Sequence, residues 1–371
     1  MKTKSSIVPA QNYSVYIGEN VFTEITHFFQ KPTSQSERKI FILVDENSLK
    51  HCLPKLIEEV FFLEKAEIIE IESGEENKNI EICTQIWRTL SELGADRKSL
   101  LINLGGGVIS DMGGFIASTF KRGIDFINIP TTLLSQVDAS VGGKTGIDLD
   151  HLKNEIGLFS SPRAVYIYPP FLKTVNKKQL FSGFAEMLKH ALVADKTYWE
   201  ELKNIDVNTI SELEKNIFTS VKIKNEIVLK DPSETGIRKA LNFGHTIGHA
   251  LESYALESDG KPLLHGEAVA IGMICEAFIS YKKKFLSAAE LQEITETILT
   301  NFEVVKLNYF DTNRLMELMK HDKKNDTGII NFTLLNGIGN VSINQSCNAE
   351  MIIKSLHYYT EETNMLSAQS S

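Results

Sequence analysis

The chain has 371 residues, of which 42% are hydrophobic and 23% charged, and this length exceeds what one hydrophobic core usually supports. Its net charge of -9 argues against a nucleic acid or an anionic membrane as a partner, because both attract basic surfaces. The four cysteines form no CxxC pair, the N-terminus lacks the apolar segment of a signal peptide, and no apolar stretch is long enough to cross a bilayer. We therefore expect a cytoplasmic protein of two domains.

Strand-like and helix-like segments alternate through the first half of the chain. Short β-branched runs lie at 39–45, 66–72, 99–104, 125–129 and 164–168. Between them, the segment 80–90 repeats apolar residues every three or four positions, which is typical of a helix. Near-continuous apolar strands separated by helices indicate a parallel sheet covered on both faces. We predict an α/β nucleotide-binding domain with a parallel-rich sheet over residues 1–176.

The second half has a different character. Long amphipathic patterns occupy 179–193, 209–229 and 266–284, and only 329–335 looks extended. We predict an all-α domain over residues 177–371.

Glycines and polar side chains follow several predicted strands, where a parallel sheet gathers its ligands. Gly105-Gly106-Gly107 follows the strand at 99–104, and such a turn lets the backbone approach a phosphate closely. Asp45, with Asn47 just beyond, suits a ribose hydroxyl, while 73–78 and Thr131-Thr132 close two further strands. The glycine run alone is equally well explained as a tight turn, but the set favours a dinucleotide.

Three of the nine histidines cluster in the second half and suggest a metal site. His245 and His249 are spaced i, i+4 on one helix face, and His265 begins a further helix. Glu186 offers a carboxylate upstream. Each histidine alone is more often a packing or capping residue, but neutral imidazoles with one carboxylate form a typical catalytic zinc shell. Lys144 lies in the glycine-rich stretch 138–146, which is expected to form a loop where a lysine can meet a phosphate or carboxylate.

Seven motifs together resemble, in order, the 3-dehydroquinate synthase family. They lie at 105–111, 130–138, 142–146, 153–157, 182–186, 238–245 and 265–269, and the resemblance runs from about residue 13 to about residue 353. It implies an N-terminal α/β nucleotide-binding domain, an α-helical C-terminal domain and an active site in the cleft between them.

The resemblance also implies a role for each matching residue. Glu186, His245 and His265 match the ligands of Zn²⁺ (or Co²⁺), so His249 becomes a proton-handling group and Glu234 a residue linked to it. The positions that match the NAD site are Asp45, Asn47, Glu75, Lys78, Gly106, Gly107, Asp111, Thr131, Thr132, Lys144, Lys153 and Thr174. The positions that match the substrate site are Arg122, Asp138, Lys144, Asn154, Lys189, Lys224, Arg238, Asn242 and one of Lys323 or Lys324. Asp138 and Lys189 join His249 and Glu234 as catalytic candidates, and Arg122 matches a contact made across a homodimer interface.

The implied reaction converts 3-deoxy-D-arabino-heptulosonate 7-phosphate, a phosphorylated sugar acid, into 3-dehydroquinate and phosphate. This carbon–oxygen lyase step of the shikimate pathway regenerates its NAD. Three alternatives stay open: another sugar phosphate cyclase, a metal-dependent polyol dehydrogenase of the glycerol dehydrogenase type, and a non-enzymatic sugar-phosphate sensor. Lys224, Arg238 and Asn242, together with His249, favour the carboxylate-bearing substrate.

Overall fold

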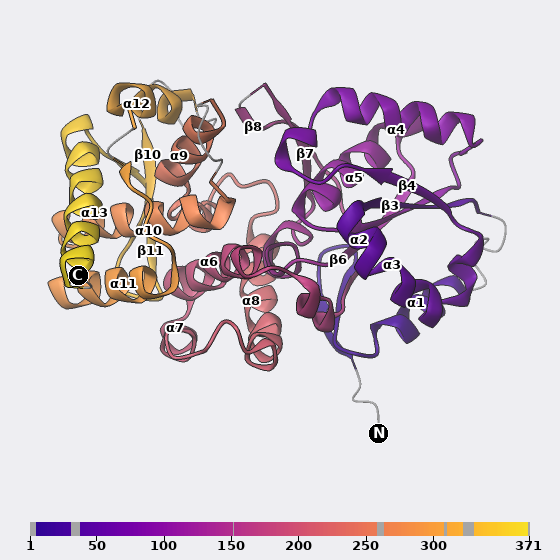
Figure 1. Cartoon of the computed structure of the whole chain (residues 1–371), viewed down its shortest axis with the longest axis horizontal. Coiled ribbons are helices and arrows are strands. Elements are labelled where there is room, and N and C mark those ends of the chain that lie inside the picture. Colours follow the sequence, from indigo (N-terminus) through magenta and orange to yellow (C-terminus); the bar gives the residue numbers. More distant parts are fainter. Residues whose placement is uncertain are drawn as a thin grey trace. The chain divides into compact units, whose positions relative to one another are not determined.

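The computed structural model describes residues 5–30, 38–150, 152–257, 263–307, 310–321 and 330–369 (Figure 1). The chain divides into two compact units. One contains Met1–Leu180 and Asn208–Leu229, and the other contains Phe181–Val207 and Lys230–Ser371. The chain thus returns to the first unit after entering the second. The division into two domains at residues 176 and 177 stays a prediction. None of the described helices is long and apolar enough to cross a membrane.

A seven-stranded sheet forms the centre of the first unit, in the order β1-β2-β9-β6-β5-β3-β4. Its strands are β1 (Ser6–Pro9), β2 (Ser14–Ile17), β3 (Ile40–Asp45), β4 (Glu67–Ile71), β5 (Leu100–Gly105), β6 (Asp125–Pro130) and β9 (Val165–Ile167). All neighbours pair in parallel except β1 and β2. The predicted parallel-rich sheet is confirmed. β1 and β2 escaped prediction because four residues are too few to establish a period.

Helices cover both faces of this sheet, because successive side chains of a strand point to opposite sides. In β3, Ile42 and Val44 pack in a cluster that includes residues of α1 (Val21–Gln30) and α3 (Leu53–Glu59). Phe41 and Leu43 pack in a second cluster with residues of α4 (Ile80–Glu92) and α5 (Gly107–Thr119). Figure 1 shows these two pairs of helices on opposite sides of the sheet. Between β3 and α3 runs the short helix α2 (Glu46–His51).

An antiparallel hairpin and one long helix complete the first unit. The strands β7 (Lys144–Leu149) and β8 (Leu152–Phe159) pair where the sequence suggested a loop around Lys144. Gly146 faces Gly157 in this hairpin, and a methyl group at Gly146 would lie 2.8 Å from the Ile156 carbonyl oxygen. The helix α8 (Ile210–Lys230) matches the predicted helix at 209–229, and its Asn225 side chain donates a hydrogen bond to the Pro9 carbonyl.

The second unit is mainly helical, as predicted. Its helices are α6 (Lys177–Ala194), which starts in the first unit, α7 (Lys196–Leu202), α9 (His245–Glu257), α10 (His265–Lys282), α11 (Ala288–Asn301), α12 (Thr312–His321) and α13 (Ala349–Gln369). α10 is buried along most of its length, which places it at the core of this unit. An antiparallel pair, β10 (Asn331–Leu335) and β11 (Val341–Ser346), is added to the helices. β11 was not predicted, because its partly exposed and largely polar sequence contains no apolar run.

Glycines allow α9 and α10 to cross at very short range. A methyl group at Gly272 would lie 1.9 Å from the Gly244 carbonyl oxygen, and one at Gly248 would lie 3.0 Å from the Ala268 carbonyl oxygen. The buried carboxylate of Glu276, in α10, accepts hydrogen bonds from the backbone N–H of Gly244 (2.6 Å) and Ile247 (3.2 Å). It therefore caps the first turn of α9, whose N–H groups have no partner within the helix. This crossing sets where the histidines of α9 lie relative to α10.

Candidate active site

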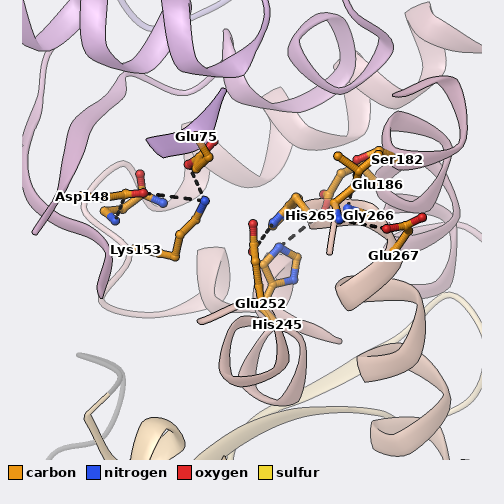
Figure 2. Close-up of polar contacts among 12 residues, drawn as sticks. Glu75, Asp148, Lys153, Ser182, Glu186, His245, Glu252, His265, Gly266 and Glu267 are labelled. Atoms are coloured by element: carbon orange, nitrogen blue, oxygen red, sulfur yellow. Dashed lines mark hydrogen bonds and ion pairs between the residues drawn. The ribbon is translucent and has the colours of Figure 1, made fainter. Parts of the chain in front are cut away.

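Three side chains of the second unit form a possible metal centre: Glu186 from α6, His245 from α9 and His265 from α10 (Figure 2). The Nε2 atoms of His245 and His265 lie 3.5 and 3.4 Å from Glu186 Oε1. Two ligands bound at about 2.0–2.1 Å to one tetrahedral zinc ion are roughly 3.4 Å apart. The donor types and their spacing therefore fit a divalent cation such as Zn²⁺.

Both imidazoles have a partner on the nitrogen that faces away from Glu186. His245 Nδ1 lies 3.0 Å from the Phe243 carbonyl oxygen, and His265 Nδ1 lies 3.1 Å from Glu252 Oε2. A carbonyl only accepts, so Nδ1 of His245 is the donor in this contact, and Nε2 is the nitrogen that faces the proposed metal position. Burial opposes the charged form of His265, but Glu252 and Glu186 outweigh it and raise the pKa of His265 to about 10. A metal at His265 must therefore displace a proton.

Two further proposed catalytic residues lie at this centre. The ring of His249 is 5.1 Å from that of His245 and 5.8 Å from that of His265, measured between centroids. A ring nitrogen of His249 lies within 4.8 Å of possible ligand atoms of Glu252 and His265. Ligand atoms of Glu186, His245 and His265 lie equally close to one another. The ammonium group of Lys189, one turn after Glu186 in α6, is buried and contacts the Glu186 carboxylate.

The loop before α9 presents Glu234, Arg238 and Asn242. Asn242 Nδ2 donates to Glu234 Oε1 at 2.7 Å, and the buried Arg238 donates through Nη1 to the Pro232 carbonyl at 2.6 Å. Glu234 has a φ of 60°, a left-handed conformation that costs free energy for a residue with a side chain. The loop therefore needs an internal support.

Asp231 supplies that support. Its buried carboxylate accepts hydrogen bonds from the backbone N–H of Thr235 (3.1 Å), Gly236 (2.7 Å) and Arg238 (3.0 Å). Burial by itself raises the pKa of Asp231, but these donors outweigh it and lower the pKa. Asp231 thus stays ionised and holds the loop in its turn.

In the first unit, the residues proposed for NAD follow adjacent strands. Asp45 ends β3, Gly106 and Gly107 follow β5, and Thr131 and Thr132 follow β6, and these three strands are neighbours in the sheet. A methyl group at Gly106 would lie 3.3 Å from the Thr132 side chain, so the two turns approach closely. α5 begins at Gly107, and its free N–H groups suit a phosphate.

The other proposed NAD residues near these strands have local contacts. Asp45 caps α2 by accepting from the Ser48 N–H at 2.7 Å, and Asn47 donates to Glu46 at 3.2 Å. Thr174 donates to the Phe171 carbonyl at 2.9 Å and is exposed.

A buried lysine joins the α5 region to the β7–β8 hairpin. Lys78 Nζ lies 2.7 Å from both Asp111 Oδ2 and Asn154 Oδ1, and 3.6 Å from Glu75 Oε1. Burial favours its neutral amine, but Asp111, Glu75 and Asp148 outweigh burial and hold the pKa of Lys78 above its usual range. Lys78 is therefore a fixed cation at the centre of this network.

The same network contains Lys153 and Asp148 (Figure 2). Lys153 contacts Glu75 and lies 3.8 Å from Asp148 Oδ2. Asp148 Oδ1 also accepts from the Asn154 N–H at 2.7 Å, which holds Asn154 at a left-handed φ of 52°. The structure thus brings Glu75, Lys78, Asp111, Lys153 and Asn154 together.

Four other proposed residues also belong to the first unit: Asp138, Lys224, Arg122 and Lys144. Lys224 Nζ contacts Asp138 through Oδ1 (2.8 Å) and the backbone oxygen (2.7 Å), and Asp138 lies in a π-helical turn, Ser135–Ala139. Arg122 is exposed and has a φ of 73°. Lys144 is exposed at the first residue of β7. Lys323 and Lys324 lie outside the described residues.

Comparison with known proteins decides the family. Residues 68–182 match the family model described as 3-dehydroquinate synthase N-terminal, and residues 183–325 match 3-dehydroquinate synthase C-terminal. A 3-dehydroquinate synthase of Parabacteroides distasonis is 46% identical over 94% of this chain and 98% of the relative. One from Helicobacter pylori is 41% identical over 93% and 96%. The chain belongs to the 3-dehydroquinate synthase family.

Solved structures show the same fold at lower identity. A 2-epi-5-epi-valiolone synthase from Streptomyces hygroscopicus, with NAD⁺ and Zn²⁺ bound, matches with a TM-score of 0.82 at 23% identity, covering 97% of this chain and 100% of that one. A 2-deoxy-scyllo-inosose synthase complexed with carbaglucose-6-phosphate, NAD⁺ and Co²⁺ gives 0.83 at 23% identity, covering 96% and 99%. A probable glycerol dehydrogenase from Sinorhizobium meliloti gives 0.63 at 15% identity, covering 96% and 98%. These likenesses confirm the fold class of this family member, an α/β sheet domain followed by a mainly helical part.

Four residues that support the site were not predicted from the sequence. Glu252, Asp231, Asp148 and Glu276 each hold a proposed site residue or its backbone, and none was singled out. Only Glu252 had a usable signal, since it lies seven positions after His245 and shares its helix face. The others accept from backbone N–H groups, which no sequence motif marks.

Proposed function

We propose that this chain is a 3-dehydroquinate synthase, which converts 3-deoxy-D-arabino-heptulosonate 7-phosphate into 3-dehydroquinate and phosphate. The observation that carries the proposal is the 46% identity that extends over 94% of the chain and 98% of a relative with that name. The valiolone and inosose synthases share the fold at 23% identity, as does the glycerol dehydrogenase at 15%, so fold alone does not separate the alternatives.

The donor set of the second unit supports a Zn²⁺ or Co²⁺ cofactor, held by Glu186, His245 and His265. The strand ends of the first unit support NAD, held by the residues around Gly106, Thr132 and Lys78. When bound, the metal polarises substrate oxygens and NAD accepts and returns a hydride, so the reaction shows no net redox change.

The side chains of the chain bind and orient the substrate and move its protons. His249 is suited to exchange a proton with a substrate hydroxyl, because it lies beside the metal centre and is only partly buried. Arg238, Asn242 and Lys189 offer donors for the carboxylate and phosphate groups. Lys224 and Asp138, paired in the first unit, are suited to hold hydroxyl or anionic groups.

The family resemblance further supports a cytoplasmic homodimer in which Arg122 contacts the substrate of the partner subunit. Its exposed position in a left-handed turn suits such a contact. Sedimentation of the purified protein, with Arg122→Ala compared for substrate KM, tests this part of the proposal. An active monomer would contradict it.

A coupled assay tests the proposed reaction. Purified protein is supplied with 3-deoxy-D-arabino-heptulosonate 7-phosphate, NAD and Zn²⁺, and phosphate is measured while absorbance at about 340 nm follows NADH. We expect equal amounts of phosphate and dehydroquinate, no accumulation of NADH, and loss of activity in chelator. Turnover of sedoheptulose 7-phosphate or glucose 6-phosphate instead would select another cyclase. Steady NADH formation from a polyol would select a dehydrogenase, and binding of sugar phosphate without turnover would select a sensor.

A further inference from the structure

Helix α9 presents three functional side chains on one face. His245, His249 and Glu252 occupy positions i, i+4 and i+7, which lie along a single stripe of an α-helix. The third of these, Glu252, is buried, with 4% of its surface exposed. A carboxylate held in such a place needs compensation by a charge or by hydrogen-bond donors.

The ring of His265 provides that compensation. Glu252 Oε2 lies 3.1 Å from His265 Nδ1, and the opposite nitrogen of the same ring, Nε2, lies 3.4 Å from Glu186 Oε1 (Figure 2). The ring of His265 therefore connects Glu252 to the metal-ligand side of the site. A ring held at one nitrogen by a carboxylate has its plane and its proton position fixed, so the other nitrogen points its lone pair in one direction.

We propose that Glu252 is a positioning residue of the metal centre, which orients His265 and sets the affinity of the site for its divalent cation. This inference rests on the proposed function, because it assumes that Glu186, His245 and His265 bind the metal. It adds a residue that lies outside the proposed ligand set and that the family motifs did not mark.

His245 and His265 differ in the partner of their Nδ1 atom. His245 is held by a backbone carbonyl, that of Phe243, whereas His265 is held by a full negative charge. The Glu186 ligand is already contacted by the ammonium group of Lys189, which offsets its charge. Glu252 therefore supplies the negative charge that balances the cation in a buried site, where an unbalanced charge is costly.

Glu252→Gln tests this role, because glutamine keeps the size and one acceptor oxygen but removes the charge. Glu267→Gln is the matched control. Glu267 lies two residues after His265 in α10, and its carboxylate accepts from the Leu264 N–H at 2.9 Å, which caps the first turn of that helix. Both variants lose one negative charge near the same histidine. Glu252→Gln loses the carboxylate that lies 3.1 Å from His265 Nδ1, whereas Glu267→Gln loses the one that accepts from Leu264.

Metal affinity is the readout, measured by chelator competition for Zn²⁺ and Co²⁺ and by the visible absorption spectrum of the Co²⁺ protein. We expect Glu252→Gln to bind both ions about 10–100-fold more weakly and to change the cobalt spectrum, while Glu267→Gln stays within about twofold of the wild type. NAD affinity, measured by fluorescence titration, should be unchanged in both and shows that the first unit is folded. If Glu252→Gln does not fold, Glu252→Asp keeps the charge at a shorter reach and should lose affinity to a smaller extent.

Wild-type metal affinity in folded Glu252→Gln, or an equal loss in Glu267→Gln, would overturn the inference. These outcomes are distinct from failure of the proposed function. A chain whose metal affinity depends on Glu252 but which does not release phosphate from the heptulosonate substrate would refute only the proposed reaction. A chain that releases phosphate but whose metal affinity does not depend on Glu252 would refute only the positioning role.

Discussion

The crossing of α9 and α10 leaves no space for a side chain at residue 272, and each of these helices begins with a proposed metal ligand. A methyl group on Gly272 would lie 1.9 Å from the Gly244 carbonyl oxygen and 2.9 Å from the Gly248 amide nitrogen. Both contacts are to backbone atoms, which a rotamer change cannot relieve. We predict that Gly272→Ala forces the two helices apart and disturbs the metal centre.

The magnitude follows from the overlap. Non-bonded heavy atoms rarely pack closer than about 3.4 Å, so the two backbones must separate by roughly 1.5 Å near Gly244. Metal ligands need to be held within about 0.5 Å of their working geometry, and His245 directly follows Gly244. Overpacking of this kind costs about 1–3 kcal/mol, against which alanine returns about 1 kcal/mol of helix propensity. We expect a net loss of up to about 2 kcal/mol in the free energy of unfolding and a zinc affinity at least about tenfold lower.

Urea unfolding and chelator competition measure these two quantities. Gly107→Ala is the control for a helical glycine that has room, because its new methyl group would meet only the Ala139 side chain, at 3.6 Å. Zinc affinity should be unchanged there. NAD affinity serves as an internal control for Gly272→Ala, since the residues proposed for NAD belong to the other compact unit. Wild-type zinc affinity and stability in Gly272→Ala would contradict this prediction.

Three further predictions concern the metal and the substrate loop. Removal of the metal with a chelator should abolish phosphate release and lower the melting temperature, and addition of Zn²⁺ or Co²⁺ should restore both. A melting temperature that calorimetry finds unchanged by the chelator would contradict a bound ion. Burial lowers the pKa of His265, but Glu252 and Glu186 raise it to about 10, so a metal displaces its proton at any lower pH. Apparent zinc affinity should therefore rise about tenfold per pH unit between about pH 6 and 8, and chelator competition that finds no slope would exclude this proton displacement. Asp231→Ala leaves three backbone N–H groups without their carboxylate, so we expect a loss of about 1–3 kcal/mol of stability and a higher substrate KM, with zinc affinity unchanged.

Local patterns in the sequence were sufficient for much of the architecture. β3, β5 and β6 are mostly apolar because both faces of a parallel sheet are covered, and such runs are visible without knowledge of their partners. The helices α4 and α8 follow the spacing of apolar residues in the same direct way, whereas α10, predicted as amphipathic, is buried along most of its length. The order of the family motifs identified the family and located the proposed metal ligands.

Pairing between distant segments was not visible in the same patterns. The β7–β8 hairpin is built from a glycine-rich stretch that has no apolar alternation, and it is a hairpin because Gly146 and Gly157 allow two backbones to approach. The four-residue strands β1 and β2 depend in the same way on a neighbouring strand. The return of 208–229 to the first unit is likewise decided by packing, since an amphipathic helix does not specify which core it covers.

The sequence by itself therefore determined the fold class, the family and the chemical types of the site residues, because each of these depends on local periodicity or on contiguous motifs. Only the tertiary structure decided which groups support them. Glu252 reaches His265 across 13 positions, Lys78 reaches Asn154 across 76, and Glu276 reaches Gly244 across 32. A hydrogen bond between such residues depends on how helices and hairpins cross, and the crossing is set by side-chain volume and glycine positions summed over a whole unit.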